Sequence, residues 1–385
     1  MTERTKTARL YFVDALRVTL TILVVAHHAG QAYGPTGGAW PVSEPRRSAL
    51  LGPFFAVNPM FFMGPFFLLA GYFATSAYDR RGAAAFLKGR LTRLGIPLLF
   101  FVLFVSAPIA YLDRGGSIVA FIGRMYQKSW TELYRHLWFV GHLLLYSVVY
   151  ALWRLLVRRT RAPAEPTQTK PLRTGGVLLL HGIVLGYAVL LALVTWAVRI
   201  QHLLDRWSRL LFVLPTEYAH LPQYVSLFVI GILAYRGNWL RRFPTSSGLI
   251  WLAIGLAAAL LYYLRDLRLV RFLPGVILDT GGRNRGSLVF SAWEALVCTG
   301  LCVGLPVLYR ELVNRRPGRL FAAAIEAQYA TYILHVPVVL GVQAALLPLE
   351  LPPLLKFAIA TFVGSVLSFG IGYLLKRIPG VKRVL

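Results

Sequence analysis

Charged side chains are scarce in this sequence. Asp, Glu, Lys and Arg make up 15% of its 385 residues, whereas in a soluble domain they make up about a quarter. Acidic residues are especially few, with 15 Asp and Glu against 41 Lys and Arg. Apolar runs of about 20 residues, the length that crosses the hydrocarbon core of a bilayer, recur along the chain. This composition excludes a soluble globular domain and predicts a polytopic membrane protein.

Cysteine and the signatures of common enzyme classes are also lacking. Only Cys298 and Cys302 occur, four residues apart in one apolar run, so neither a disulfide framework nor a zinc site is expected. The chain contains no G-x-S-x-G, H-E-x-x-H, G-x-x-x-x-G-K-[ST] or Asp-x-Asp element. Serine hydrolase, zincin, P-loop NTPase and metal-dependent glycosyltransferase functions therefore have no support. We expect no metal and no permanently bound cofactor.

The formal net charge of +26 would fit a nucleic-acid-binding protein. Here, however, the basic residues cluster in short segments between apolar runs, as the positive-inside rule describes for membrane proteins. We therefore expect membrane lipid and no nucleic acid as the partner of this charge. Asp14 and Arg17 interrupt the first apolar run, which favours a retained first span over a cleavable signal peptide.

Ten spans are predicted, and counting basic residues orients them. With the N-terminus inside, the inner segments hold 24 Lys and Arg and the outer segments hold 15. We therefore expect an all-α polytopic membrane protein of about ten transmembrane helices in the cytoplasmic membrane. Both termini would be cytoplasmic, and residues 1–385 would form a single domain. The predicted spans lie near residues 11–33, 54–75, 94–112, 137–157, 176–198, 218–235, 247–264, 288–309, 328–347 and 354–375.

The first span carries four polar residues on one helix face. At 100° per residue, Arg17 and Thr21 fall within 20° of His28, and Asp14 lies 40° from it. Arg17 and His28 are about 16 Å apart along the helix axis. His27, by contrast, shares its face with apolar residues. Because ionisable residues inside a membrane usually face a bundle interior or a wet cavity, this stripe is a functional-site hypothesis. The alternative for His28 is an interfacial histidine without a chemical role.

A second basic feature precedes the third span, where Arg90 and Arg93 lie three residues apart on one helix face. Arginine suits bidentate phosphate recognition. Ordinary flanking charge is the alternative, and the spacing alone does not separate the two.

The order of several elements resembles the acyltransferase 3 family of integral membrane acyltransferases. The Arg17-x10-His28 spacing and the Arg90-x-x-Arg93 pair before "RLGIPLL" carry the resemblance. Further elements are "YFVDALR", "FFLLAGYFATS", "HLWFVGHLLLY" and "YATYILHVPV". The wording of "HLWFV" and "FLLAGYF" is most similar to the branch of periplasmic-glucan succinyltransferases. Two positions depart from the family pattern, Ala70 before Gly71 and Gln328 before Tyr329.

The resemblance implies transfer of an acyl group, acetyl or succinyl, from acyl-coenzyme A as co-substrate to a hydroxyl of a glycan or another extracytoplasmic acceptor. His28 would be the general base, because imidazole can take a proton near neutral pH. Arg90 and Arg93 would bind the coenzyme A phosphates. Arg17 would contact the donor midway or, as the alternative, orient a neighbouring group, with Asp14 as its i,i+3 partner. Direct transfer and an acyl-histidine intermediate both remain open, and the sequence does not decide whether a homo-oligomer forms.

Three further polar groups are candidates for supporting roles. His335 shares a helix face with Tyr332 in "YILHVPV" and is expected near the site or the donor, with a buried structural histidine as the alternative. Glu294, in the outer half of the eighth span, is a candidate for holding an acceptor hydroxyl. A transporter or flippase without acyl-transfer chemistry is the competing function, since it also explains many spans with buried charges.

Overall fold

The computed structural model describes residues 9–35, 40–106, 117, 119, 130–157, 174–269 and 279–385, and these are mostly helical. The one sheet in this part of the chain is a hairpin in which β1 (Trp207–Leu210) pairs antiparallel with β2 (Leu214–Glu217). The sequence analysis did not predict this hairpin. The all-α prediction is confirmed.

Within the described ranges, nine helical stretches are long and apolar enough to cross a membrane, which confirms a multi-pass membrane protein. One of them, Ala49–Ser106, contains both the second predicted span and the start of the third. The remainder of the third, 107–112, lies outside the described residues.

The long helices are α1 (Tyr11–Gly30), α3 (Gly64–Arg90), α7 (Trp138–Leu156), α8 (Thr174–Arg199), α9 (Leu221–Gly237), α11 (Thr245–Asp266), α12 (Arg285–Val313), α13 (Arg319–Leu346) and α14 (Pro353–Leu375). The shorter ones are η1 (Ala49–Leu51), α2 (Gly52–Phe61), η2 (Leu91–Gly95), α4 (Ile96–Phe100), η3 (Phe101–Ser106), η5 (Trp130–Leu137), η6 (Tyr218–His220), α10 (Trp239–Arg242) and α15 (Val381–Val384).

The second predicted span is not one continuous helix. The helix is interrupted at Phe62 and Met63, so that α2 ends before α3 begins. Pro65 explains the interruption, because proline has no N–H to donate to the carbonyl four residues earlier and its ring crowds that carbonyl. The predicted span over 54–75 lies within one apolar helical stretch, and the sequence analysis did not predict the interruption in it.

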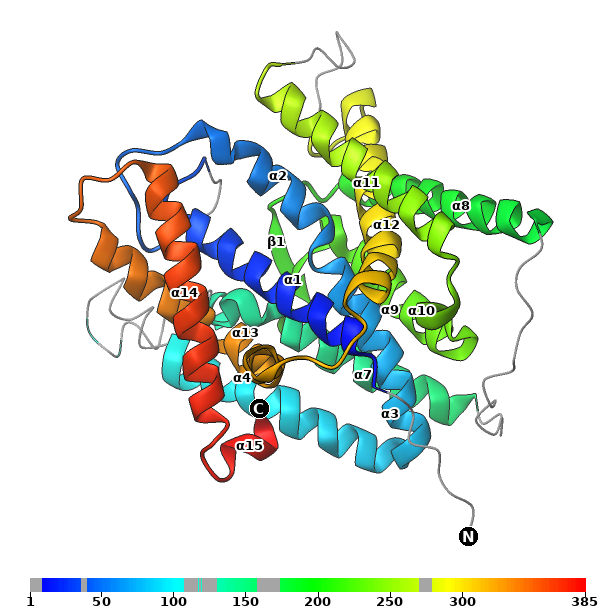
Figure 1. The fold of residues 1–385 in the computed structure, drawn as a ribbon, viewed down its shortest axis with the longest axis horizontal. Helices are drawn as coiled ribbons and strands as arrows, with labels where there is room; N and C mark the ends of the chain where they lie inside the picture. Colours follow the sequence, from blue (N-terminus) through cyan, green and yellow to red (C-terminus); the bar gives the residue numbers. More distant parts are fainter. Residues whose placement is uncertain are drawn as a thin grey trace.

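Helix α1 lies in the middle of the bundle. It packs against α12, α13 and α14, and Figure 1 shows α13 and α14 on one side of it and α8, α11 and α12 on the other. Arg9 and Lys376 line the same cavity, so α1 begins and α14 ends on the same side of the molecule. That this side is cytoplasmic stays a prediction.

Glycine allows a close helix contact between α3 and α9. A Cβ atom added at Gly71 would lie 2.0 Å from the carbonyl oxygen of Phe228, and one added at Gly231 would lie 2.0 Å from that of Leu68. Small residues at helix interfaces are typical of membrane proteins, where close packing and not the hydrophobic effect drives association. The contact holds α3, which carries part of the site described below, against the bundle.

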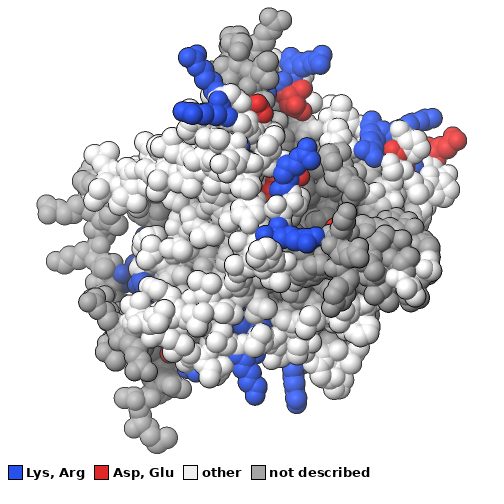
Figure 2. Space-filling view, turned by 180° about the vertical axis from the view of Figure 1, so that it is seen from behind, with Lys and Arg blue, Asp and Glu red and all other residues white. Residues whose placement is uncertain are grey.

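The surface is consistent with a lipid environment. On the face drawn in Figure 2, wide uncharged areas separate groups of Lys and Arg, several of which lie at its upper and lower edges. The exposed apolar side chains include Leu99, Leu179 and Phe362.

Replacing Gly71 by Ala should destabilise the fold by about 1–3 kcal/mol, because the added methyl group would overlap the backbone of α9. The measurement is thermal unfolding of the purified protein in detergent. Gly370→Ala in α14 is the control, since a Cβ there has no atom within 4 Å, and alanine favours helix. Equal unfolding temperatures for the two variants would contradict this account of the contact.

Candidate functional site

A cavity of about 570 Å³ opens where α1, α3, α7 and α13 meet, and seven basic and two acidic side chains line it. The predicted residues Arg17, Arg90, Arg93, Asp14 and Tyr332 are all among its lining residues. The structure adds four further cations, which are Arg9, Arg80, Arg81 and Lys376. The structure therefore brings the two separate basic features of the sequence, on α1 and before the third span, into one place.

A bend in α3 brings cations from both halves of this helix to the cavity. Gly82 has φ 74° and ψ 172°, a conformation that residues with a Cβ atom rarely adopt. The chain turns there, so that Arg81 before the bend and Arg90 after it line the same space. The Arg90 guanidinium also lies 5.1 Å from the ring of Phe86.

The carboxylate of Asp14 does not pair with Arg17, contrary to the expected i,i+3 contact. Its Oδ2 lies 2.7 Å from Nε of Arg9, a residue on the N-terminal side of α1. Among the described residues, no carboxylate lies within ion-pair distance of Arg17, Arg90 or Arg93. Because taking a charge out of water is costly unless it is paired, this cavity is suited to an anionic ligand.

Lys376 adds to the positive potential at the cavity from just beyond α14. Its Nζ donates to the carbonyl oxygen of Glu326. Burial lowers the pKa of Lys376, the charge of Glu326 raises it, and the charges of Arg93 and Lys382 lower it further. A bound anion would relieve this repulsion among neighbouring cations.

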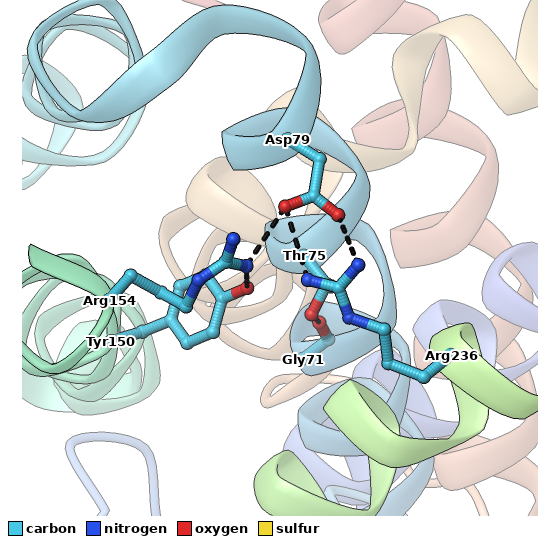
Figure 3. Close-up of polar contacts among 6 residues, drawn as sticks. All are labelled: Gly71, Thr75, Asp79, Tyr150, Arg154 and Arg236. Carbon is cyan, nitrogen blue, oxygen red and sulfur yellow. Dashed lines mark hydrogen bonds and ion pairs between the residues drawn. The ribbon is translucent and has the colours of Figure 1, made fainter. Parts of the chain in front are cut away.

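Asp79 anchors the part of α3 that leads into the bend. Figure 3 shows its carboxylate between two guanidinium groups, Arg154 of α7 and Arg236 of α9, with distances of 2.9 Å and 2.7 Å. The Arg154 guanidinium also donates to the hydroxyl of Tyr150. These contacts join three helices directly before Arg80 and Arg81, and they fix the position of that edge of the cavity.

Three histidines form a cluster beyond the end of the cavity at which Tyr332 lies. Ring centroids of His28 and His335 lie 4.9 Å apart, those of His136 and His335 4.6 Å, and those of His28 and His136 6.1 Å. None of the three lines the cavity as such. In the described part of the chain, no group of three His, Cys, Asp or Glu side chains is arranged to hold a metal ion.

The hydrogen bonds of this cluster assign the protonated nitrogen of each neutral ring. Nδ1–H of His335 donates to the carbonyl oxygen of Tyr332 at 2.7 Å, which leaves its Nε2 as an acceptor. Nδ1–H of His28 then donates to the carbonyl oxygen of Val24 at 3.0 Å and faces Nε2 of His335 at 3.3 Å. Nε2 of His28 is consequently unprotonated and able to accept a proton.

The cavity and the cluster are connected by shared helix faces. On α1, Arg17 and Thr21 line the cavity and His28 follows two turns farther on the same face. On α13, Tyr332 lines the cavity and His335 follows three residues later. The lining faces of two helices thus lead from the cations to the histidines, as the α1 stripe predicts.

Two residues lie close to His28 near the C-terminal end of α1. The ring of Trp40 lies 5.6 Å from that of His28, and its Nε1–H donates to Gln343. The Gln343 amide in turn donates to the carbonyl oxygens of His28 and Ala29. His27 faces away, with its ring 5.2 Å from each of two phenylalanine rings, in the apolar surroundings expected for it.

Glu294 does not join this site. Its carboxylate contacts the guanidinium of Arg199 and, at 3.4 Å, Nε2 of His220, and all three side chains are buried. His220 also pairs with Glu217 at 2.8 Å. Burial raises the pKa of Glu217, but His220 and the backbone amide of Asp205 outweigh this effect, so that its pKa lies below the usual value. The partners of Glu294 are therefore protein groups, and its expected role toward an acceptor has no support from these contacts.

The sequence analysis singled out neither His136 nor Trp40. The signal for His136 was present, because it begins the "HLWFVGHLLLY" element that carries part of the family resemblance. Trp40 follows a Pro- and Gly-rich stretch without a repeating pattern. Only its contact with α1 and α13 gives it a place in the site.

Residues 10–377 match the model of the acyltransferase 3 family, which is described as an acyltransferase domain. The match covers nearly the whole chain and does not select a branch of the family. Searches of curated proteins and of solved structures return no match.

The tautomers assigned above can be measured directly. In ¹⁵N NMR spectra of histidine-labelled protein at alkaline pH, His28 and His335 should appear as Nδ1–H tautomers and His136 as the Nε2–H tautomer. Each signal would be assigned by its loss in the corresponding His→Gln variant. An Nε2–H tautomer at His28 would mean that Nε2 is not free to accept a proton.

Proposed function

This chain belongs to the acyltransferase 3 family, and from that premise we propose that it transfers an acyl group from acyl-coenzyme A to a hydroxyl of an extracytoplasmic acceptor. It is a multi-pass membrane acyltransferase. Family membership favours this function over a transporter or flippase without acyl-transfer chemistry. We further propose that coenzyme A is the carrier, that the acyl group is acetyl or succinyl, and that the acceptor is a glycan.

One observation carries the proposal of a coenzyme A donor: a cavity in which Arg17, Arg90 and Arg93 have no carboxylate partner among the described residues leads toward an imidazole with a free nitrogen. Arg90 and Arg93 would bind the phosphate groups of the donor, which are multiply charged anions that suit guanidinium. The other lining cations, Arg80 and Arg81, would share this charge. We place the cavity mouth at the cytoplasmic side of the cytoplasmic membrane, where coenzyme A thioesters are made.

The pantetheine arm would then run along α1 from Arg17 toward His28, a distance of about 16 Å. Tyr332 and Phe139, whose rings lie 5.6 Å apart, line the inner part of the cavity. Because the histidines lie beyond these two rings, the arm would pass beside them to reach His28. Tyr332 has a supporting role in this proposal, and His335 orients the base through its contact with His28 Nδ1.

The chemistry follows from the tautomer of His28. Its Nε2 accepts the proton of the acceptor hydroxyl as the oxygen attacks the thioester carbonyl carbon. The C–S bond then breaks, and the thiolate of coenzyme A takes the proton from Nε2. The products are the acyl ester and free coenzyme A, and this direct transfer needs no covalent enzyme intermediate. The contact of Nδ1–H with Val24 and His335 stabilises the imidazolium that forms during the attack.

The acceptor would approach His28 from the side of Trp40, opposite to the donor cavity. An aromatic ring beside the reacting centre is suited to the apolar face of a sugar, which supports a glycan as acceptor. The resemblance of "HLWFV" to the glucan succinyltransferases supports succinyl as one acyl group to test beside acetyl.

His28→Ala should abolish transfer, because general-base catalysis contributes about 10²–10⁴-fold to the rate. The assay is acceptor-dependent release of free thiol from acetyl- or succinyl-coenzyme A by the purified protein in nanodiscs. His27→Phe is the matched control, since its neighbours are already aromatic, and it should retain activity. Full activity of His28→Ala, or its loss only in His27→Phe, would contradict the assigned base.

Arg90→Ala should raise KM for the donor by about 10–100-fold with little change in kcat, because a charge-assisted hydrogen bond contributes about 1.5–3 kcal/mol to binding. Arg46→Ala, an exposed arginine outside the cavity, is the control and should leave KM unchanged. If wild-type protein neither releases thiol from any acyl-coenzyme A nor binds coenzyme A by calorimetry, the donor is of another kind.

A further inference from the structure

His136 carries a buried acceptor atom that the protein does not use. Its Nε2–H donates to the carbonyl oxygen of Ile333 at 3.0 Å, which leaves Nδ1 with a free lone pair. The side chain is 5% exposed, and no donor among the described residues reaches Nδ1. Buried polar atoms in folded proteins are nearly always bonded, so an unused one points to a missing partner.

Hydrogen bonds hold His136 in place beside a strained backbone position. The preceding residue, Arg135, has φ 45° and ψ −128°, which is an unfavourable conformation for a residue with a Cβ atom. Its Nε–H donates to Ser106 at 3.0 Å, and the hydroxyl of Tyr332 donates to the carbonyl oxygen of His136. The chain is thus tied on both sides of the turn, and strain that is maintained in this way is typical of functional positions.

His136 lies on the route proposed for the donor. One turn farther along the chain, Phe139 lines the cavity, and Leu143 lines it one turn beyond that. His136 therefore extends the cavity-lining face of α7 toward the cluster. Its ring lies 5.6 Å from that of Tyr332, which lines the cavity, and 6.1 Å from that of His28.

We propose that Nδ1 of His136 accepts a hydrogen bond from the amide N–H of the pantetheine arm nearest to the thioester. This inference rests on the proposed coenzyme A donor. In that donor two methylene groups separate the amide nitrogen from the sulfur, so the bond fixes the thioester carbonyl close to His28. An amide N–H is an uncharged hydrogen-bond donor. It therefore suits a buried nitrogen acceptor in an apolar bundle, where a charged donor would be costly to bury. His136 is on this account a residue that binds the donor and determines its specificity.

The test compares acyl-coenzyme A with an analogue in which this amide is replaced by an ester, so that N–H becomes oxygen and every phosphate is kept. Wild-type protein should use the amide donor with a kcat/KM roughly tenfold higher, the usual effect of one lost hydrogen bond with a buried partner. In His136→Phe the two donors should be used equally. His136→Gln, which retains one donor and one acceptor, should restore part of the preference.

The matched control is His27→Phe, which should keep the preference of the wild type. Equal use of both donors by the wild type overturns the inference, even where His136→Phe does not fold. An unchanged preference in His136→Phe also overturns it, as does a changed preference among acceptors instead of donors. If wild-type protein consumes neither thioester, the proposed function itself fails, and that result is distinct from transfer without discrimination.

Discussion

Positive charge inside an apolar helix bundle needs a counter-charge, and in this protein several of the few carboxylates are paired with basic groups that the predicted site does not include. Asp14 pairs with Arg9, Asp79 with Arg154 and Arg236, and Glu294 with Arg199. Glu44 pairs with the buried Lys356. The shortage of acidic residues in the composition therefore has a structural counterpart. Within the described part of the chain, Arg17, Arg90 and Arg93 have no carboxylate within ion-pair distance, and an anionic ligand can complete this site.

The site separates two chemical tasks along one helix. Near Arg17 the surroundings are rich in charge and suit the recognition of a charged group. Around His28 the neighbours are imidazole rings, an indole and a backbone carbonyl, groups that suit the transfer of a proton. The network of Arg199, Glu294 and His220 lies apart from both and ties α8, α12 and η6 together. Its contacts are those of a structural network.

The sequence predicted what depends on local geometry. The period of the α-helix is enough to place Asp14, Arg17 and Thr21 on the cavity side of α1, and apolar length is enough to identify the spans. Contacts between segments that are distant in the sequence could not be predicted in this way. His136 and Ile333 are 197 positions apart, so no spacing rule connects them. The pairing of Asp14 with Arg9 depends on the backbone conformation just before α1. A proline such as Pro65 can either interrupt a helix or remain within it, and the sequence alone does not decide between the two.

The continuity of α1 fixes the relative position of the two groups that it carries. The helix is unbroken from Tyr11 to Gly30 and carries both Arg17, the cation proposed to contact the donor, and His28, the proposed base. One residue inserted between Arg17 and His28 would rotate the imidazole by about 100° relative to the cation and move it by about 1.5 Å. His335 and Trp40 would then face a different side chain. A change in the length of a surface loop leaves the relative positions of Arg17 and His28 unaltered, whereas an insertion or deletion within this eleven-residue interval changes both their distance and their orientation.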